Sequence, residues 1–337
     1  MPGSVDVAFT REPRHEVGSG LAGAVDRTLL YRDGSRLDGV GRLSVLDLWR
    51  GGLPQRVGYF GDLRVRSQAR RPARILRDGY RILCEAAEEL GVAGCFTSIA
   101  TDNDRARRVL ERGRRIGLPE YLPIADLVTL VVPVRRPRAP FGDPAPKAHA
   151  TESELTSFLD GVARGHDLAL VWNTDRWRAL GRHGLSPTDF HVVREEGRVV
   201  AAAGLWDQRP FKQTVIHGYH GALRWSRPLV NPLAALGWAP PLPPPGAVLS
   251  QGYLVGAVTH ARHWPGLLRA LKAGAARRRL DWMVLSRDAR DPELATLRKL
   301  TRAREYHTRL YEVRWGELPN WTGERGERFL RPEAALL

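Results

Sequence analysis

Six arginines gather in one short stretch of the chain, between an apolar segment and a helical pattern. They are Arg64, Arg66, Arg70, Arg71, Arg74 and Arg77. The apolar segment, residues 57–65, has the composition of a strand, and a helix is predicted from about residue 75 to residue 90. A helix start presents unpaired N–H groups and a partial positive charge, and arginine pairs well with phosphate. The stretch therefore predicts a site for an anionic cofactor.

Two predicted helices and a strand would hold this site in place. Apolar residues recur at helical spacing from residue 75 until Gly91 ends the pattern. Asn103, between two aspartates, offers an N-cap for a second helix that Gly113 would close. An apolar strand then spans residues 127–134. Both helices are expected to pack on a sheet.

Upstream of the arginines, glycine turns separate short apolar segments. The turns are Asp33-Gly34 and Gly51-Gly52, and glycine supplies the positive φ angles that tight hairpins require. The pattern predicts an antiparallel meander with strands at residues 27–32, 39–48 and from 57 onward, preceded by a short strand at residues 6–9.

A proline-rich stretch divides the chain. Residues 136–147 carry four prolines within ten residues, which is typical of a stiff linker. It predicts a first domain over residues 1–135, a second over 148–315 and a polar tail over 316–337. The second unit repeats the element order of the first without repeating its sequence. Its predicted elements are a helix at 152–163, a hairpin at 189–208, strands at 214–220 and 249–259, a helix at 267–279, a strand at 282–286, a helix at 292–304 and a strand at 308–315. A proline-rich segment at 239–246 is expected to be a connecting loop inside this unit.

Composition narrows the class of protein. At 337 residues and 43% apolar content the chain can bury full cores. No apolar run reaches the roughly 18 residues of a membrane span and no signal-peptide pattern opens the chain, so a cytoplasmic location is the expectation. The two cysteines, Cys84 and Cys95, are expected to be buried and reduced. Histidine pairs at 217/220 and 260/263 lack acidic or cysteine partners, so no metal is expected.

The net charge of +15 leaves a nucleic-acid partner open. The chain has 48 arginines and 4 lysines, however, a skew that base composition of a genome also produces. The arginines are spread along the sequence, and their densest cluster lies at the predicted cofactor site. Nucleic acid is therefore the less favoured partner, with tRNA not excluded.

Four motifs in order resemble the GNAT superfamily of acyl-CoA-dependent N-acyltransferases. They are Gly61-Asp-Leu-Arg-Val65, the arginine turn, Asn103-x-x-Ala106 and Gly117-Leu-Pro-x-Tyr121. The match covers roughly residues 5–135, and the remainder resembles a second GNAT-like domain by element order, as in tandem acetyltransferases. The resemblance implies an α/β fold of two consecutive GNAT-like domains. Each would have a mostly antiparallel mixed sheet with a central splayed strand and helices on both faces.

The resemblance also implies how the cofactor, acetyl-CoA or another acyl-CoA, would be held. The backbone of the splayed strand pairs with the pantetheine arm and the turn after it wraps the pyrophosphate, while Ile75 stands where the family usually has glycine or alanine. The cofactor-binding residues are then Leu63, Arg64, Val65, Arg70, Arg71, Ala73, Arg74, Asn103 and Ala106.

The implied reaction is direct attack of a primary amine of a small molecule or peptide on the thioester. The family's usual acid, a tyrosine, falls at Leu110, so Tyr121 is the substitute candidate, the alternative being a packing tyrosine. Asp62 would act as base or orient the amine, or would simply pair with an arginine. A backbone N–H near Val65 would polarise the carbonyl.

Three hypotheses follow from these residues. The first is an N-acetyltransferase with its site in the first domain and the second domain as a non-catalytic wall of the acceptor cleft. The others are a catalytically degenerate GNAT-like binding or scaffolding protein and an aminoacyl-tRNA-dependent transferase. A homodimer is left open. The strand and helix with which a GNAT domain usually begins are missing before residues 6–9. Three explanations are open: the true N-terminus lies upstream, the first strand is absent, or the tail from Gly316 covers the exposed edge of the first sheet. The last is the favoured expectation.

Overall fold

The computed structural model describes residues 5–18, 20–21, 25–134, 150–221, 223–225, 230–232, 242–316, 318 and 328–337. The predicted meander is confirmed: β2 (Val25–Asp33), β3 (Arg36–Arg50) and β4 (Leu53–Val65) pair antiparallel in sequence order. Gly34, Gly51 and Gly52 have φ angles of 62°, 58° and 82°, as the turns require. The proline-rich linker at residues 136–147 and the first part of the proline-rich segment at 239–246 lie outside the described residues.

The helices of the first half lie where the apolar spacing places them. α1 (Pro72–Glu89) turns Ile75, Tyr80, Leu83 and further apolar residues inward, and Cys84 is buried among them. β5 (Cys95–Ala100), α2 (Asp104–Glu111) and β6 (Glu120–Pro133) follow. Both cysteines are free and buried, as expected, and burial raises the pKa of each thiol.

The described residues of the second half contain the predicted elements, together with helical segments that were not predicted. α3 (Glu152–Ala163) is followed by α4 (Thr174–Gly181), a short helix that the sequence pattern did not predict. The remaining elements are β7 (Phe190–Glu195), β8 (Arg198–Trp206), β9 (Gln213–Tyr219), β10 (Gln251–Thr259), α6 (Trp264–Arg277), β11 (Trp282–Asp288), α7 (Glu293–Thr301) and β12 (Arg304–Arg314).

Ten of the described strands form one continuous sheet with the order β2-β3-β4-β5-β12-β6-β11-β10-β8-β7. All neighbours are antiparallel except β4 with β5 and β10 with β11. The two halves therefore exchange strands at the centre: β12 lies beside β5, and β6 lies beside β11. β12 and β6 then pair with each other along their length. The expected mixed, mostly antiparallel α/β sheet is confirmed.

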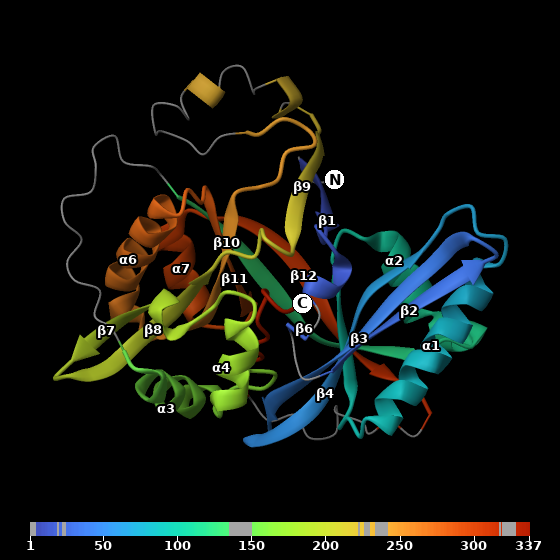
Figure 1. Cartoon of the computed structure of the whole chain (residues 1–337), viewed down its shortest axis with the longest axis horizontal. Helices are drawn as coiled ribbons and strands as arrows, with labels where there is room; N and C mark the ends of the chain where they lie inside the picture. Colours follow the sequence, from blue (N-terminus) through green and yellow to red (C-terminus); the bar gives the residue numbers. More distant parts are fainter. Residues whose placement is uncertain are drawn as a thin grey trace.

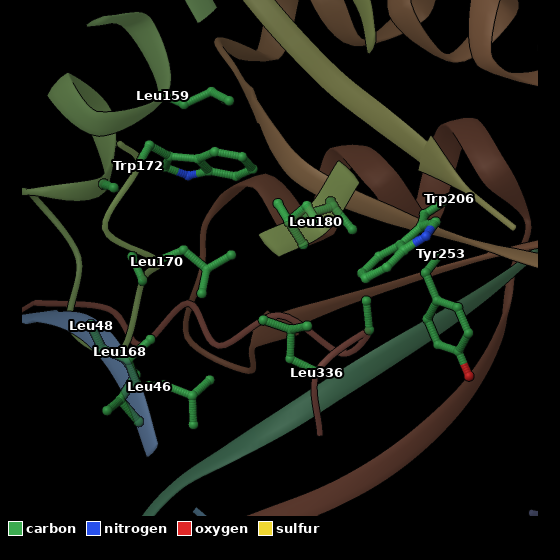
Figure 2. Close-up of a cluster of buried hydrophobic side chains, with 14 of the residues drawn as sticks. Leu46, Leu48, Leu159, Leu168, Leu170, Trp172, Leu180, Trp206, Tyr253 and Leu336 are labelled. Atoms are coloured by element: carbon green, nitrogen blue, oxygen red, sulfur yellow. The ribbon is translucent and has the colours of Figure 1, made fainter. Parts of the chain in front are cut away.

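Helices cover both faces of the sheet. α1 and α2 lie over the first half, and α6 and α7 lie over the second (Figure 1). On the opposite face α3 and α4 pack with Leu46 and Leu48 of β3, Trp206 of β8 and Leu336 near the end of the sequence (Figure 2). This second core joins residues from both halves, so the sheet is stabilised from either side.

The two ends of the chain lie at this second face and not beside β2. β1 (Val5–Thr10) pairs antiparallel with β9 in a separate two-stranded sheet (Figure 1). Residues 328–337 pair with Asp167 and bury Ala335 and Leu336 in the joint core. The predicted covering of the first sheet edge is therefore wrong for residues 328–337, because their apolar side chains gain more from burial than from lying along a polar edge. No helix in the described part of the chain is both long and apolar enough to cross a membrane.

Candidate functional site

The site begins where two parallel strands diverge. β4 and β5 pair only at Gly58 with Cys95 and at Tyr59 with Phe96. Beyond Tyr59 no described strand pairs with this edge of β4, although β3 still pairs with the other edge. The Tyr59 hydroxyl lies 2.9 Å from the Ser98 hydroxyl across the opening. The divergence leaves backbone groups of β4 available to a ligand, as the predicted splayed strand requires.

Asp62 forms a β-bulge in the open part of β4. Asp62 and Leu63 together face Gly41 of β3, and Asp62 has a φ of 53°. Such a bulge re-aims side chains and backbone groups. The carboxylate lies 3.0 Å from Nη2 of Arg11 and 3.2 Å from Nε of Arg42. Burial alone would raise the pKa of Asp62, but Arg42 and Arg11 outweigh it and hold the pKa below its ordinary value.

A cavity of about 480 Å³ lies in front of this bulge. Its walls come from both halves: β4 and β5 of the first, β10 and β11 of the second, and the exchanged strands β6 and β12. Ala334 and Leu337 form part of the wall. Asp62 and Arg64, both predicted from the sequence, line it, and Arg64 also lines a narrow groove between β4 and α1. Arg64 therefore joins the cavity to the side on which the arginine turn lies.

The arginine turn leads into the start of α1. Arg71 is the N-cap residue without a side-chain cap, Pro72 is the first helical residue, and the first turn contains no acidic side chain. The side chains of Arg70 and Arg71 are exposed and have no ion-pair partner among the described residues, whereas Arg74 lies 3.4 Å from Asp78. Unpaired first-turn N–H groups and free guanidinium groups fit the pyrophosphate of an acyl-CoA.

Ile75 does not crowd this turn. Its side chain points into the core between α1 and the sheet, where a Cβ added to Gly39 of β3 would lie only 2.7 Å from its Cγ2. The absence of a side chain at Gly39 on the facing strand makes room for Ile75. Because Ile75 points inward, it does not cover the solvent-facing side of the start of α1.

The other predicted cofactor residues have local structural contacts. Asn103 is the N-cap of α2, and its Oδ1 accepts a hydrogen bond of 3.1 Å from the backbone N–H of Ala106. Ala106 packs against the core beneath α1. Leu63 and Val65 line the groove beside Arg64, and Ala73 is exposed in the first turn of α1. Asn103 and Ala106 do not line the cavity, so the structure brings together the β4 residues but not the whole predicted set.

Tyr121 lies away from the cavity. Its ring packs with those of Tyr80 and Tyr311, and its hydroxyl shares a short hydrogen bond with that of Tyr80. Burial, followed by the neighbouring Tyr80, raises the pKa of Tyr121 well above the ordinary value. These contacts agree with the alternative interpretation of Tyr121 as a packing tyrosine. A proton donor to the cavity would have to be another residue.

The second half contains an equivalent of the splayed site. β10 and β11 pair in parallel as far as Tyr253 with Val284. Gly256, three residues beyond Tyr253 just as Asp62 is three beyond Tyr59, lies at a bulge and has a φ of 56°. The backbone N–H of Gly256 donates a hydrogen bond of 2.9 Å to the Glu333 carboxylate. The last segment of the sequence therefore occupies the second opening, whereas the first faces the cavity.

Two cationic residues of the cavity were missed by the sequence analysis. Arg11 follows β1, and Lys212 precedes β9; the pairing of Thr10 with Gln213 places them side by side. Lys212 Nζ donates to the backbone oxygens of Leu337 at 2.8 Å and Ala335 at 3.4 Å. The only signal in the sequence is that lysine is rare in this chain, and pairing of β1 with a strand some 200 residues away left no local pattern. No group of acidic, cysteine or histidine side chains in the described residues could hold a metal ion.

No protein-family model matches the chain, and no curated protein matches it. Among solved structures, N-myristoyltransferase from Saccharomyces cerevisiae with bound myristoyl-CoA is 9% identical with a TM-score of 0.51, and the alignment covers 88% of this chain and 71% of that one. A GCN5-related N-acetyltransferase from Sphaerobacter thermophilus is 15% identical with a TM-score of 0.47, covering 86% and 81%. A putative acetyltransferase from Pyrococcus horikoshii is 10% identical with a TM-score of 0.46, covering 92% and 79%. At 9% identity, the likeness to N-myristoyltransferase shows a shared fold.

Proposed function

We propose that this chain, which has the fold of the GNAT superfamily, is an acyl-CoA-dependent N-acyltransferase with its site in the first half. The observation that carries the proposal is the open edge of β4, which bulges at Asp62 and faces a cavity of about 480 Å³. Arg64 links this cavity to the groove beside α1. A thioester could lie along β4 while its nucleotide end meets the arginine turn.

The bound acyl-CoA would supply the activated acyl group. Leu63, Arg64 and Val65 would hold its pantetheine arm through their backbone, and Arg70, Arg71 and Arg74 would pair with its phosphates near Ala73. Unpaired N–H groups at the start of α1 would add to this charge-assisted binding. Asn103 and Ala106 would contact the cofactor from the start of α2. Acetyl-CoA is the cofactor we propose, because it is the smallest acyl donor and leaves the cavity to the acceptor.

The acceptor would be a primary amine that enters the cavity. Asp62 stays ionised because Arg42 and Arg11 lower its pKa, so it would accept a hydrogen bond from the amine and orient it rather than take its proton. The Ser98 hydroxyl lines the cavity and lies 2.9 Å from that of Tyr59, so it would donate a proton to the leaving thiolate. This hydroxyl pair takes the place for which Tyr121 was the sequence-based candidate.

Thermal shift with acetyl-CoA tests the cofactor site. A ligand at 100 times its dissociation constant stabilises the folded state by about 2.7 kcal/mol, so the melting temperature of the wild-type protein should rise with acetyl-CoA concentration. The double substitution Arg70→Gln/Arg71→Gln should weaken binding by about 10- to 100-fold, because each removes charge-assisted hydrogen bonds. Arg81→Gln is the matched control, since Arg81 is exposed on the same helix and pairs with Glu85.

Release of the CoA thiol in the presence of amines then separates an enzyme from a degenerate binding protein. Stabilisation by acetyl-CoA without thiol release from any amine would favour the binding or scaffolding hypothesis. Absence of stabilisation at millimolar acetyl-CoA would argue against the cofactor site itself. Steeply salt-dependent binding of tRNA would instead favour the aminoacyl-tRNA-dependent alternative.

A further inference from the structure

The cavity contains more positive than negative side chains. Arg11, Arg64 and Lys212 line it, and Asp62 is the one acidic side chain among the lining residues that the structure describes. Arg42 is buried directly behind Asp62, with its Nε 3.2 Å from the carboxylate. Lys212 already donates to Leu337 at 2.8 Å and is left out of this balance; Arg11, Arg42 and Arg64 still share the single carboxylate of Asp62. This imbalance would be relieved by a ligand that brings a negative charge.

The ionisation of Lys212 reflects the same imbalance. Burial, and then the positive charges of Arg11 and Arg42, lower the pKa of Lys212 to about 7, and Asp62 offsets this only in part. The Lys212 ammonium also lies over the ring of Tyr253, 5.4 Å from its centroid. A buried cation that repels its neighbours gains stability when an anion enters between them. A carboxylate beside Lys212 and Arg11 would therefore bind with uptake of a proton.

The position of these cations relates the anion to the reaction. Arg11 donates to Asp62 at 3.0 Å, and Asp62 is the bulge residue that we place beside the reacting amine. Lys212 lies next to Arg11 in the pairing of β1 with β9. A carboxylate held by Arg11 and Lys212 thus lies close to the amine position. In an α-amino acid the two groups are separated by one carbon atom, which fits this short spacing; the amine and carboxylate of a peptide are farther apart.

The rest of the cavity is largely apolar. Phe9 of β1, Leu249 before β10, Val284 of β11 and Tyr306 of β12 contribute to its walls. A side chain placed among them would be removed from water at roughly 25 cal/mol per Å² of buried apolar surface. Building on the acyltransferase function proposed above, we propose that the acceptor is a free α-amino acid with an apolar side chain, whose carboxylate is bound by Arg11 and Lys212. Its neutral α-amine would attack the acetyl carbonyl, forming the amide carbon–nitrogen bond as the carbon–sulfur bond breaks. The departing sulfur would take the Ser98 proton and leave as the thiol of CoA, and the proton lost by the nitrogen would pass to solvent, from which Ser98 is reprotonated.

A matched set of acceptors tests this assignment with the full chain and acetyl-CoA. L-Phenylalanine is compared with L-phenylalaninamide, phenethylamine and phenylalanylglycine, and thiol release is measured. The expected kcat/KM for phenylalanine is at least about 10-fold above that for each of the others, as one charge-assisted contact allows. The amide has the more readily deprotonated amine, so preference for the acid cannot come from amine ionisation. Equal or faster reaction of the amide would overturn the proposal.

Variants assign the preference to the two cations. Lys212→Met and Arg11→Gln should each lower the ratio of kcat/KM for phenylalanine to kcat/KM for phenethylamine by about 10-fold, because only phenylalanine carries the carboxylate. Lys212→Arg should retain the preference, because it keeps the charge. An equal fall in kcat for both acceptors in Lys212→Met would mean that Lys212 acts in the chemistry, and would overturn its role in binding the carboxylate.

Failure of this inference can be distinguished from failure of the proposed function. If acetyl-CoA neither stabilises the protein nor reacts with any amine, the proposed function fails as well. If acetyl-CoA reacts with the amide alone, only this inference fails.

Discussion

Lys212 couples the cavity to the stability of the fold. Its pKa is about 7 in the folded protein, against an ordinary value of 10.5. Between these pH values the unfolded chain holds a proton that the folded chain has released, so the free energy of unfolding should rise with pH over this window and level off below it. This window of three to four pH units corresponds to an upper bound of about 5 kcal/mol. Lys212→Met should remove this contribution.

Urea unfolding at pH 7 and pH 9.5 measures the effect. The free energy of unfolding of the wild-type protein should increase relative to Lys212→Met between the two pH values. Lys299→Met provides the control, because Lys299 is exposed on α7 and its removal should leave the pH dependence unchanged. A difference between wild type and Lys212→Met that does not vary with pH would contradict the low pKa of Lys212.

At the scale of single residues, the site residues that could be predicted lie close together in the sequence, and those that were missed come from distant segments. Asp62 and Arg64 are local to the β4 motif, so they could be predicted and both line the cavity. Tyr121 was chosen as a substitute just beyond the second helix, because the family's usual tyrosine position is Leu110, and the structure buries it beside Tyr80. Arg11 and Lys212 meet only through the pairing of β1 with β9. Contacts between segments so far apart have no periodic signal in a single sequence.

At the scale of elements, α1 is fitted to β3 by a pair of complementary residues. Gly39 leaves space for Ile75, since a Cβ at Gly39 would lie 2.7 Å from Cγ2 of Ile75. Gly39→Ala should therefore reduce the free energy of unfolding by about 1–3 kcal/mol through overpacking. Ile75→Ala alone should cost about 2–5 kcal/mol by leaving a cavity. In the double variant the added methyl has room, so the two costs should not add.

A double-mutant cycle by urea unfolding measures this coupling. Gly161→Ala on α3 is the control, because a Cβ there meets nothing within 4 Å, and it should stabilise the helix by up to about 1 kcal/mol. Additive costs of Gly39→Ala and Ile75→Ala would show that the two residues do not compete for space. The acetyl-CoA affinity of Ile75→Ala reports in addition whether the helix start depends on this packing.

Most elements were predictable because their apolar spacing is regular. α3 spans the predicted residues 152–163, with Thr151 and Glu154 forming the capping box that fixes its start. α4 was missed because it is only 8 residues long and follows buried, irregular chain. β12 was expected within the second unit, but its observed neighbours are β5 and β6 of the first half. Strand order depends on pairing between distant segments, which a local sequence pattern does not reveal.

At the scale of the whole molecule, the two halves are joined by exchanged strands. β12 forms eleven residue pairs with β6 and six with β5, while β6 forms seven with β11. The core that contains Leu46, Trp206 and Leu336 also draws on both halves. The cavity has walls from each. An acceptor site between the halves therefore depends on this exchange as much as on either half.

The exchange predicts that the halves stay together when the connection between them is cut. A protease site inserted after residue 140 would break the chain in the proline-rich linker without removing any described strand. The cleaved protein should elute as one species in gel filtration, unfold in a single transition and keep its stabilisation by acetyl-CoA, because β6 and β12 would still be paired. The uncleaved protein carrying the same insertion is the control. Separation of the two fragments without denaturant, or two resolved unfolding transitions after cleavage, would show that each half is stable without the strand it receives from the other.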